Sequence, residues 1–141
     1  MEENKKLKVL LCSPLGNNGV GGISRWTQHI LGYCNSINTE IELEHSYTYG
    51  KVVYGGTGLL LRIYYGINSY LPFLKKLSRK LNCKNYDVVH FASSASISLV
   101  KDIFSLYIVR KKNVKSIIHF HFGRIPNLFE KKIGSINLYI K

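Results

Sequence analysis

Three histidines stand where their side chains could take part in ligand binding or proton transfer. His119 and His121 are two residues apart in a strand-like run, so their side chains should face the same side of that strand. An H-x-H pair can chelate a metal, but a usable site needs further ligands, and no acidic residue lies nearby in the sequence. We therefore expect no metal. We expect His119 to be a hydrogen-bonded core residue. His121, nearest the strand end, and His90, mid-strand or at a strand end, are candidate ligand-facing residues.

A glycine-containing loop follows the first strand-like run and precedes a predicted helix. Gly21 and Gly22 lack side chains, so their backbone N–H groups can approach a ligand closely. The start of the helix carries unpaired N–H groups and partial positive charge, which suits a phosphate. The alternative is a turn that needs a positive φ angle. The dinucleotide pattern G-x-G-x-x-G fails at Ser24, and no Gly-Lys-Ser/Thr of a P-loop follows the glycines.

The other polar residues indicate no covalent chemistry. No Ser-His-Asp or Cys-His arrangement and no pair of carboxylates can be assembled from spacing alone, so a reaction would depend on positioning and charge stabilisation. Cys12, Cys34 and Cys83 are widely spaced and form no C-x-x-C pair. We expect them to be buried, reduced thiols rather than disulfide partners or zinc ligands.

Alternating strands and helices are predicted to position these residues. Apolar runs indicate strands at 8–13, 87–92 and 115–122, an alternating edge strand at 41–49 and a short strand at 52–54. Helical spacing predicts helices at 23–34, 59–81 and 96–111, with Pro72 kinking or dividing the second. This order predicts an α/β fold with a mostly parallel, Rossmann-like sheet. Because ligands bind beyond the carboxyl ends of such strands, the glycines, Ser93, Ser94 and the histidines should converge there.

The two later helices carry apolar residues at helical spacing. Those of 96–111 that fall on one side are Ile97, Val100, Ile103, Phe104 and Tyr107. The segment 59–81 ends in four cations, Lys75, Lys76, Arg79 and Lys80. It could rest on an anionic membrane, with Tyr and Leu inserted and the cations among the headgroups. The alternative is a core-packing helix with a solvated basic end.

Length and charge bound the possible functions. The 141 residues suffice for one domain, and the formal net charge of +12 favours anionic partners such as phosphorylated substrates, acidic lipids or nucleic acid. No apolar run is long enough to span a bilayer, and the N-terminus lacks the apolar core of a signal peptide. We therefore expect a cytoplasmic protein.

The order of motifs resembles a known family. The run K-V-L-L-C-S-P followed by G-V-G-G-I-S-R-W is similar to the start of retaining glycosyltransferases of family four, which have the two-domain GT-B fold. D-V-V-H-F-A-S-S resembles the second signature of that family, and S-I-I-H-F-H-F-G resembles the third. The resemblance extends from about Lys8 to Pro126.

The resemblance implies an acceptor-binding amino-terminal domain and a donor-binding carboxy-terminal domain, with the active site between them. It matches Gly21 and Gly22 to the glycines that approach the donor diphosphate, and His121 to a catalytic-site histidine near the transferred sugar. Arg124 is matched more weakly as a substrate-binding residue, and His90 is a further candidate. The family needs no cofactor or metal; its nucleotide-sugar donor is a substrate.

The resemblance also implies that residues 1–141 are a truncated acceptor-side domain. The basic residue and Glu-x7-Glu motif of the donor domain are absent from this sequence. We therefore expect a chain that is inactive alone, with the donor domain supplied elsewhere. The implied role is hexosyl transfer to a saccharide or lipid-linked acceptor in cell-surface polysaccharide synthesis, at the inner face of the membrane and without nucleic acid. The alternatives are a basic module that binds anionic lipid or nucleic acid, and a dinucleotide-binding domain.

Overall fold

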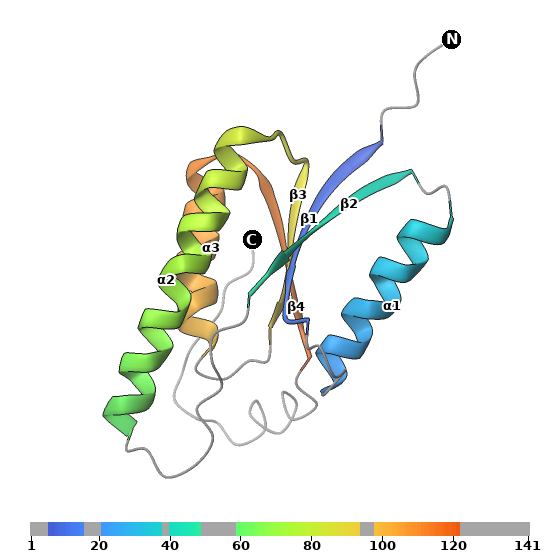
Figure 1. Ribbon diagram of the computed structural model, residues 1–141. Helices are drawn as coiled ribbons and strands as arrows, with labels where there is room; N and C mark the ends of the chain where they lie inside the picture. The colour runs from blue at the N-terminus through green and yellow to red at the C-terminus, as the bar shows by residue number, and fades with distance from the viewer. Residues whose placement is uncertain (1–5, 16–20, 38–39, 49–58, 94–97, 122–141) are drawn as a thin grey trace, which may run out of the picture.

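The computed structural model describes residues 6–15, 21–37, 40–48, 59–93 and 98–121 (Figure 1). Strands and helices alternate along the described chain. The elements are β1 (Leu7–Ser13), α1 (Gly22–Ser36), β2 (Ile41–Tyr47), α2 (Leu59–Cys83), β3 (Val88–Ser93), α3 (Ser98–Lys111) and β4 (Lys115–Phe120). The predicted strands at 8–13, 41–49, 87–92 and 115–122 and all three predicted helices are confirmed to within a few residues. The expected strand at 52–54 lies outside the described residues.

The four strands form one all-parallel sheet in the order β2-β1-β3-β4. Leu7 pairs with Ile41, and Val9 pairs with Val88, so β1 lies between β2 and β3. The continuous apolar run of β1 fits this central place, because a strand buried on both faces has no solvent-facing positions. Since β2 lies at an edge, its predicted edge position is confirmed. The fold is α/β and Rossmann-like, as predicted from the order of elements.

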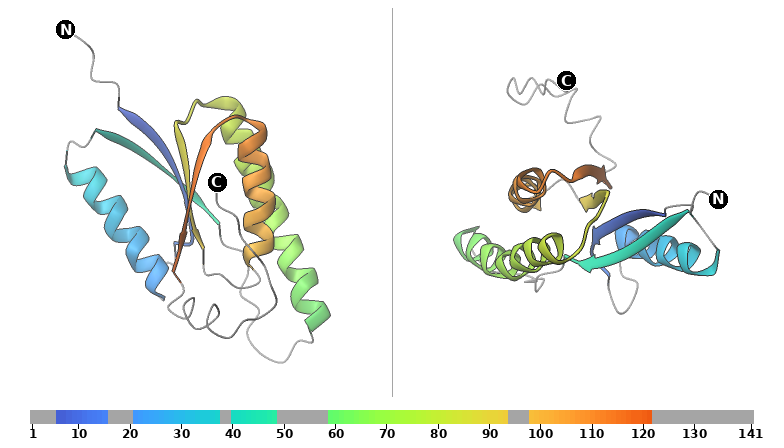
Figure 2. Two further views of the ribbon diagram at one scale, coloured as in Figure 1. Left: turned by 180° about the vertical axis from the view of Figure 1, so that it is seen from behind. Right: turned by 90° about the horizontal axis from the view of Figure 1, so that it is seen from above.

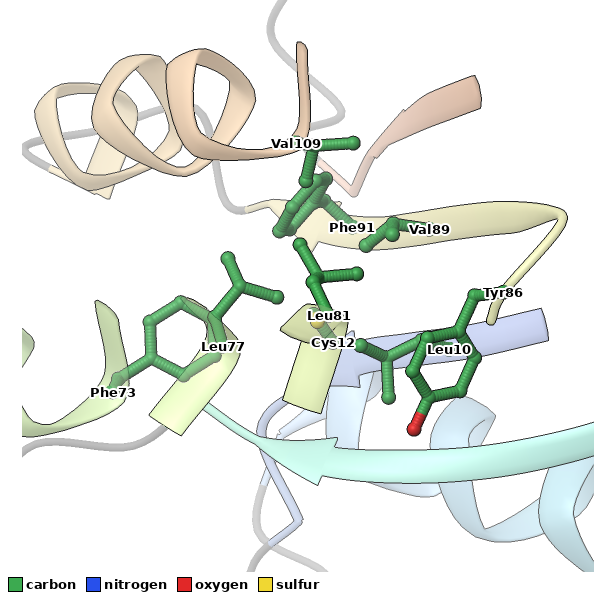
Figure 3. Close-up of a cluster of buried hydrophobic side chains, with 9 residues drawn as sticks. All are labelled: Leu10, Cys12, Phe73, Leu77, Leu81, Tyr86, Val89, Phe91 and Val109. Carbon is green, nitrogen blue, oxygen red and sulfur yellow. The ribbon is translucent and has the colours of Figure 1, made fainter. Parts of the chain in front are cut away.

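The apolar core lies between the sheet and α2 and α3, which lie side by side on the same face (Figures 1 and 2). Leu10, Cys12, Val89 and Phe91 supply the sheet side of this core, with Tyr86 beside them. Figure 3 shows them against Phe73, Leu77 and Leu81 of α2 and Val109 of α3. Leu10, Leu77, Val89 and Val109 are fully buried, which makes this face the main source of hydrophobic stabilisation.

The opposite face is covered by α1, which packs on β1 and β2. The side chains of β1 alternate, so Ser13 points to the α1 side and contacts Thr27, whereas Cys12 points into the core. On the same side of β4, Ile117 remains 52% exposed. This face of the sheet is therefore covered at one edge and open at the other.

One prediction of local structure is wrong. Cys12 is buried, but Cys34 is half-buried and Cys83 exposed, so the cysteines are not all buried thiols. Pro72 lies inside α2, which continues past it as one helix. Ile103, Phe104 and Tyr107 of α3 are 64%, 55% and 58% exposed, so the side of α3 that carries them faces outward.

The side of α3 that faces inward is partly polar. It buries Lys101, Asp102 and Ser105 together with Val109. An apolar periodicity counts apolar residues only, so it could not identify this partly polar inner side. Among the described helices, none combines the length and the apolar character that crossing a bilayer requires.

Candidate functional site

A tryptophan and three histidines from different elements meet near the carboxyl ends of β3 and β4. Trp26 of α1 lies edge-on to all three rings, with centroid distances of 5.7 Å to His90, 5.1 Å to His119 and 4.8 Å to His121. The rings of His119 and His121 are 4.0 Å apart, and those of His90 and His119 stack at 6.0 Å. We call these four residues the Trp–His cluster.

Backbone pairing holds the cluster in place. His90 is opposite Leu11 of β1 and Ile117 of β4, well inside the sheet. His121 directly follows β4, and its backbone N–H donates to the Ser93 carbonyl at 2.8 Å, which extends the β3–β4 pairing by one residue. Because alternate residues of a strand share a face, His119 and His121 both point to the α1 side, where Trp26 meets them.

The surroundings of His90 and His121 lower the pKa of both side chains. Burial lowers the pKa of His90, and the neighbouring His119 and His121 lower it further. Burial and His119 likewise lower the pKa of His121. The Nε2 atoms of His90 and His121 are buried and have no hydrogen-bond partner among the described residues. A buried ring nitrogen without a partner costs free energy, so a ligand hydroxyl or phosphate that reached it would gain a hydrogen bond.

The helix that carries Trp26 starts at the same edge of the sheet (Figure 1). Gly21 is the N-cap of α1 and has φ +102°, a conformation that strongly favours glycine. The positive φ of Gly21 agrees with the alternative explanation of the glycine pair, a turn that needs a positive φ angle. No side chain of the described residues caps α1, and a Cβ atom on Gly21 or Gly22 would meet nothing within 4 Å. The helix start is therefore open on the outside and can present N–H groups to an anion.

A second polar group joins β1, α1 and β2. The Thr27 hydroxyl lies 3.0 Å from Ser13 Oγ and 2.8 Å from the Ile23 carbonyl, and His45 Nε2 lies 3.1 Å from both Ser13 Oγ and the Ser13 carbonyl. A carbonyl can only accept, so Nε2 of His45 must carry the hydrogen. The same nitrogen cannot then accept a proton from Ser13. This group fastens α1 to the sheet and does not form a serine nucleophile.

A third polar group lies on the core side at the end of β3. The Ser93 hydroxyl donates to the Asp102 carboxylate, whose other oxygen lies 3.3 Å from Lys101 Nζ. Both charged side chains are almost fully buried. Lys101 Nζ also lies 5.7 Å from the Tyr70 ring centre and 5.8 Å from that of Phe73. Since each charge is compensated, this group fixes α3 to the carboxyl end of β3.

The structure brings most of the predicted site residues to one region. Gly21 and Gly22 start α1, whose Trp26 contacts both His121, at the carboxyl end of β4, and His90, in the middle of β3. Arg124 and Ser94 are outside the described residues. His119 is exposed, so its predicted place in the core is wrong; Trp26 of α1 lies against its ring without burying it. No group of three or more His, Cys, Asp or Glu in the described ranges is placed to hold a metal.

Trp26 is the residue of this region that sequence reasoning missed as a site residue. Its spacing assigned it to the apolar side of α1, and that helical spacing is also what brings it against the strand histidines. A tryptophan one turn after a glycine pair was the available signal, because the first turn of that helix lies at the ligand-binding edge of a parallel sheet.

Comparison with protein-family models finds no match to this chain, and neither do comparisons with curated proteins and with solved structures. The features of this chain that bear on function are the Trp–His cluster, the start of α1 and the sequence motifs.

Proposed function

We propose that this chain is the acceptor-side, Rossmann-like domain of a nucleotide-sugar-dependent glycosyltransferase that resembles retaining family four. The observation that carries the proposal is the Trp–His cluster, which lies at the edge of the parallel sheet where the first helix also begins. An aromatic ring beside neutral imidazoles suits a saccharide, because the ring covers apolar C–H faces and the imidazoles exchange hydrogen bonds with hydroxyls.

Each part of the site has a role in this proposal. His121 contacts the transferred sugar near the reacting centre, and His90 supports the same pocket wall through its buried Nε2. Gly21 and Gly22 let backbone N–H groups and the positive end of α1 approach the donor diphosphate, whose negative charge grows as it departs. The lowered pKa values of His90 and His121 keep both rings neutral at physiological pH, so each can donate and accept.

The proposal gives this domain one side of a reaction site. A second domain with the family's basic residue and Glu-x7-Glu motif would supply the donor side, on this protein or on another chain. We propose that the complete enzyme transfers a hexosyl group to a saccharide or lipid-linked acceptor on the cytoplasmic side of a membrane. Residues 1–141 alone are expected to show no transfer, and sustained turnover by that purified chain would contradict this assignment.

Ligand binding can be tested through Trp26, the single tryptophan of the chain. Its emission should change on titration with oligosaccharides or uridine-diphosphate sugars. His121→Ala should weaken that binding about fivefold, as expected for a lost hydrogen bond. His29→Ala is the matched control, because His29 is an exposed histidine of the same helix as Trp26 and outside the cluster.

Two outcomes would count against the proposal. If neither saccharides nor nucleotide sugars alter Trp26 emission, the cluster is not a sugar site. If NADH instead binds with saturating change in its own fluorescence, the dinucleotide-binding alternative is favoured.

A further inference from the structure

The outward sides of α2 and α3 expose an unusual number of apolar side chains. We call this region the α2–α3 outer surface; its exposed apolar and aromatic residues are Tyr64, Leu71, Leu99, Ile103, Phe104 and Tyr107. The inward sides of both helices are already used, because Phe73, Leu77 and Val109 fill the core (Figure 3). The exposed set is therefore in excess of what the fold needs.

The charges on the same two helices are almost all positive. Residues 59–83 contain no Asp or Glu, and residues 98–111 contain only Asp102, which is 1% exposed and paired with Lys101. Among the helix residues whose exposure the structure describes, the exposed cations are Lys75, Lys76 and Arg79 on α2 and Arg110 and Lys111 on α3. No described residue of either helix therefore offers an exposed carboxylate that would repel an anionic surface.

Apolar and cationic groups are interleaved on this surface. On α2, Leu71 precedes Lys75 by one turn, and on α3 the Nζ atom of Lys111 lies 4.6 Å from the centre of the Tyr107 ring. Leu71 and Ile103 are 47% and 64% exposed, so each leaves apolar area in water. A partner that covers this surface must therefore offer both an apolar environment for the exposed side chains and negative charge for the lysines and arginines.

We propose that the α2–α3 outer surface docks on an anionic phospholipid bilayer. The aliphatic and aromatic side chains enter the boundary between headgroups and acyl chains, while the cations meet lipid phosphates. A nucleic acid would engage the cations but would give Leu71 and Ile103 no apolar environment, so lipid is the better fit. This proposal stands without the glycosyltransferase assignment, because it uses none of the residues of the Trp–His cluster.

The docked orientation leaves the candidate site accessible. Trp26 and α1 lie on the other face of the sheet from α2 and α3 (Figure 2). A membrane beneath the α2–α3 outer surface therefore does not cover the cluster.

Vesicle co-sedimentation of the full chain tests the proposal. Binding is expected to phosphatidylcholine vesicles that contain phosphatidylglycerol, with weaker binding to phosphatidylcholine alone and with loss at high salt. Lys75→Gln/Arg79→Gln should lower the binding constant about 25-fold, at about fivefold for each cation. Ile103→Ser/Phe104→Ser should lower it about tenfold without any change in charge.

Two matched measurements separate docking from a general effect of charge. Lys8→Gln/Lys115→Gln removes the same charge from exposed sites at the strand starts and should change the binding constant by less than about threefold. In a Trp26→Phe background, Phe104→Trp should show a blue-shifted emission on adding anionic vesicles. Wild-type Trp26, on the far side, should show none.

Three results would overturn the proposal. One is vesicle binding that is unchanged by both the cation and the apolar double variants. Another is salt-sensitive binding to polynucleotide that needs the cations but not Ile103 and Phe104, with no vesicle binding. The third is a dimer in sedimentation velocity that Ile103→Ser/Phe104→Ser dissociates, because a second copy would then cover the surface.

Discussion

The two faces of the sheet are built from different chemistry. Beneath α2 and α3 the packing is apolar through Leu77, Val89 and Phe91, with one buried ion pair where α3 begins. Beneath α1 the contacts are polar, through Ser13, Thr27 and His45. Beyond α1 the same face carries the histidines of β3 and β4.

This difference separates stability from binding. Apolar burial on the α2–α3 side stabilises the fold by itself, and of the two buried oxygens there that lack a hydrogen-bond partner among the described residues, Ser46 Oγ and Asp102 Oδ1, the second lies against the Lys101 charge. The α1 side holds two ring nitrogens, His90 Nε2 and His121 Nε2, that the described residues leave without a partner. Substitutions on the first face should therefore change mainly the free energy of unfolding. Substitutions in the Trp–His cluster should change mainly ligand binding.

The ion pair on the apolar face gives the largest expected effect. Asp102→Leu would leave Lys101 buried without its counter-ion, and we expect a loss of about 4 kcal/mol in the free energy of unfolding, measured with urea. The double variant Lys101→Met/Asp102→Leu should recover most of that loss, because no buried charge remains. If the double variant is as unstable as the single one, the pair is not the reason for the loss.

The apolar packing comes next. Leu77→Ala removes a fully buried side chain from the centre of the core and should cost about 3 kcal/mol in urea-induced unfolding. Leu71→Ala, on the same helix but 47% exposed, is the matched control and should cost no more than about 0.5 kcal/mol. Equal losses at the two positions would contradict the assignment of the inner side of α2.

The hydrogen bonds that hold α1 on the sheet should contribute less to the free energy of unfolding than the apolar core does. Thr27→Val keeps the shape of the side chain but removes the hydroxyl that meets Ser13 and Ile23, so we expect a loss of about 1 kcal/mol. Thr27→Ser retains the hydroxyl and should lose less than Thr27→Val in the same thermal or urea unfolding experiment. A neutral Thr27→Val would show that the hydrogen bonds are exchanged for water without cost.

Substitution of the buried histidines should have the smallest effect on the free energy of unfolding at neutral pH. That effect should grow as the pH falls. Burial lowers the folded-state pKa of His45, His90 and His121 below the ordinary value of 6.5, so the unfolded chain binds more protons as the pH falls through that value. The contribution of these neutral histidines to the free energy of unfolding should therefore be fully present above about pH 7 and decline as the pH drops below 6.5. Urea midpoints between pH 7.5 and about 5 would check this, and His90→Gln should flatten the decline.

Glu44 titrates in a separate and lower window. Burial opposes its ionisation, but hydrogen bonds from Lys80, Lys84 and Tyr86 lower its pKa to about 2. Its stabilising contribution is therefore present above the ordinary value of 4.5 and is lost only as the pH falls from there toward 2. A loss of stability that begins below pH 6.5 thus belongs to the histidines rather than to this carboxylate.

The sheet could be predicted from the sequence because its two central strands, β1 and β3, are largely buried. The apolar runs at Val9 and Val88 identify such strands directly, and the alternation after Ile41 identifies an edge. The inner side of α3 could not be predicted in this way. Asp102 and Lys101 are buried because Ser93 and two aromatic rings of α2 meet them, and those partners are distant in the sequence.

The candidate site was predictable in its location but not in its composition. The rule that ligands bind beyond parallel strand ends placed Gly21, His90 and His121 in one region. It did not reveal Trp26 as their neighbour, because an aromatic residue at helical spacing is the usual sign of core packing. Nor did it reveal the contact between Ser13 and His45, which depends on the register of β1 and β2.

The central place of β1 has a consequence for how the protein forms during synthesis. Leu10 and Cys12 leave the ribosome before Leu77, Val89 and Val109, which bury them. The packing around β1 is therefore incomplete until residue 109 has emerged, and parallel pairing of such distant segments is slow. Over that interval an apolar strand is exposed to other nascent chains, so co-translational holding by a chaperone should raise the yield of this protein.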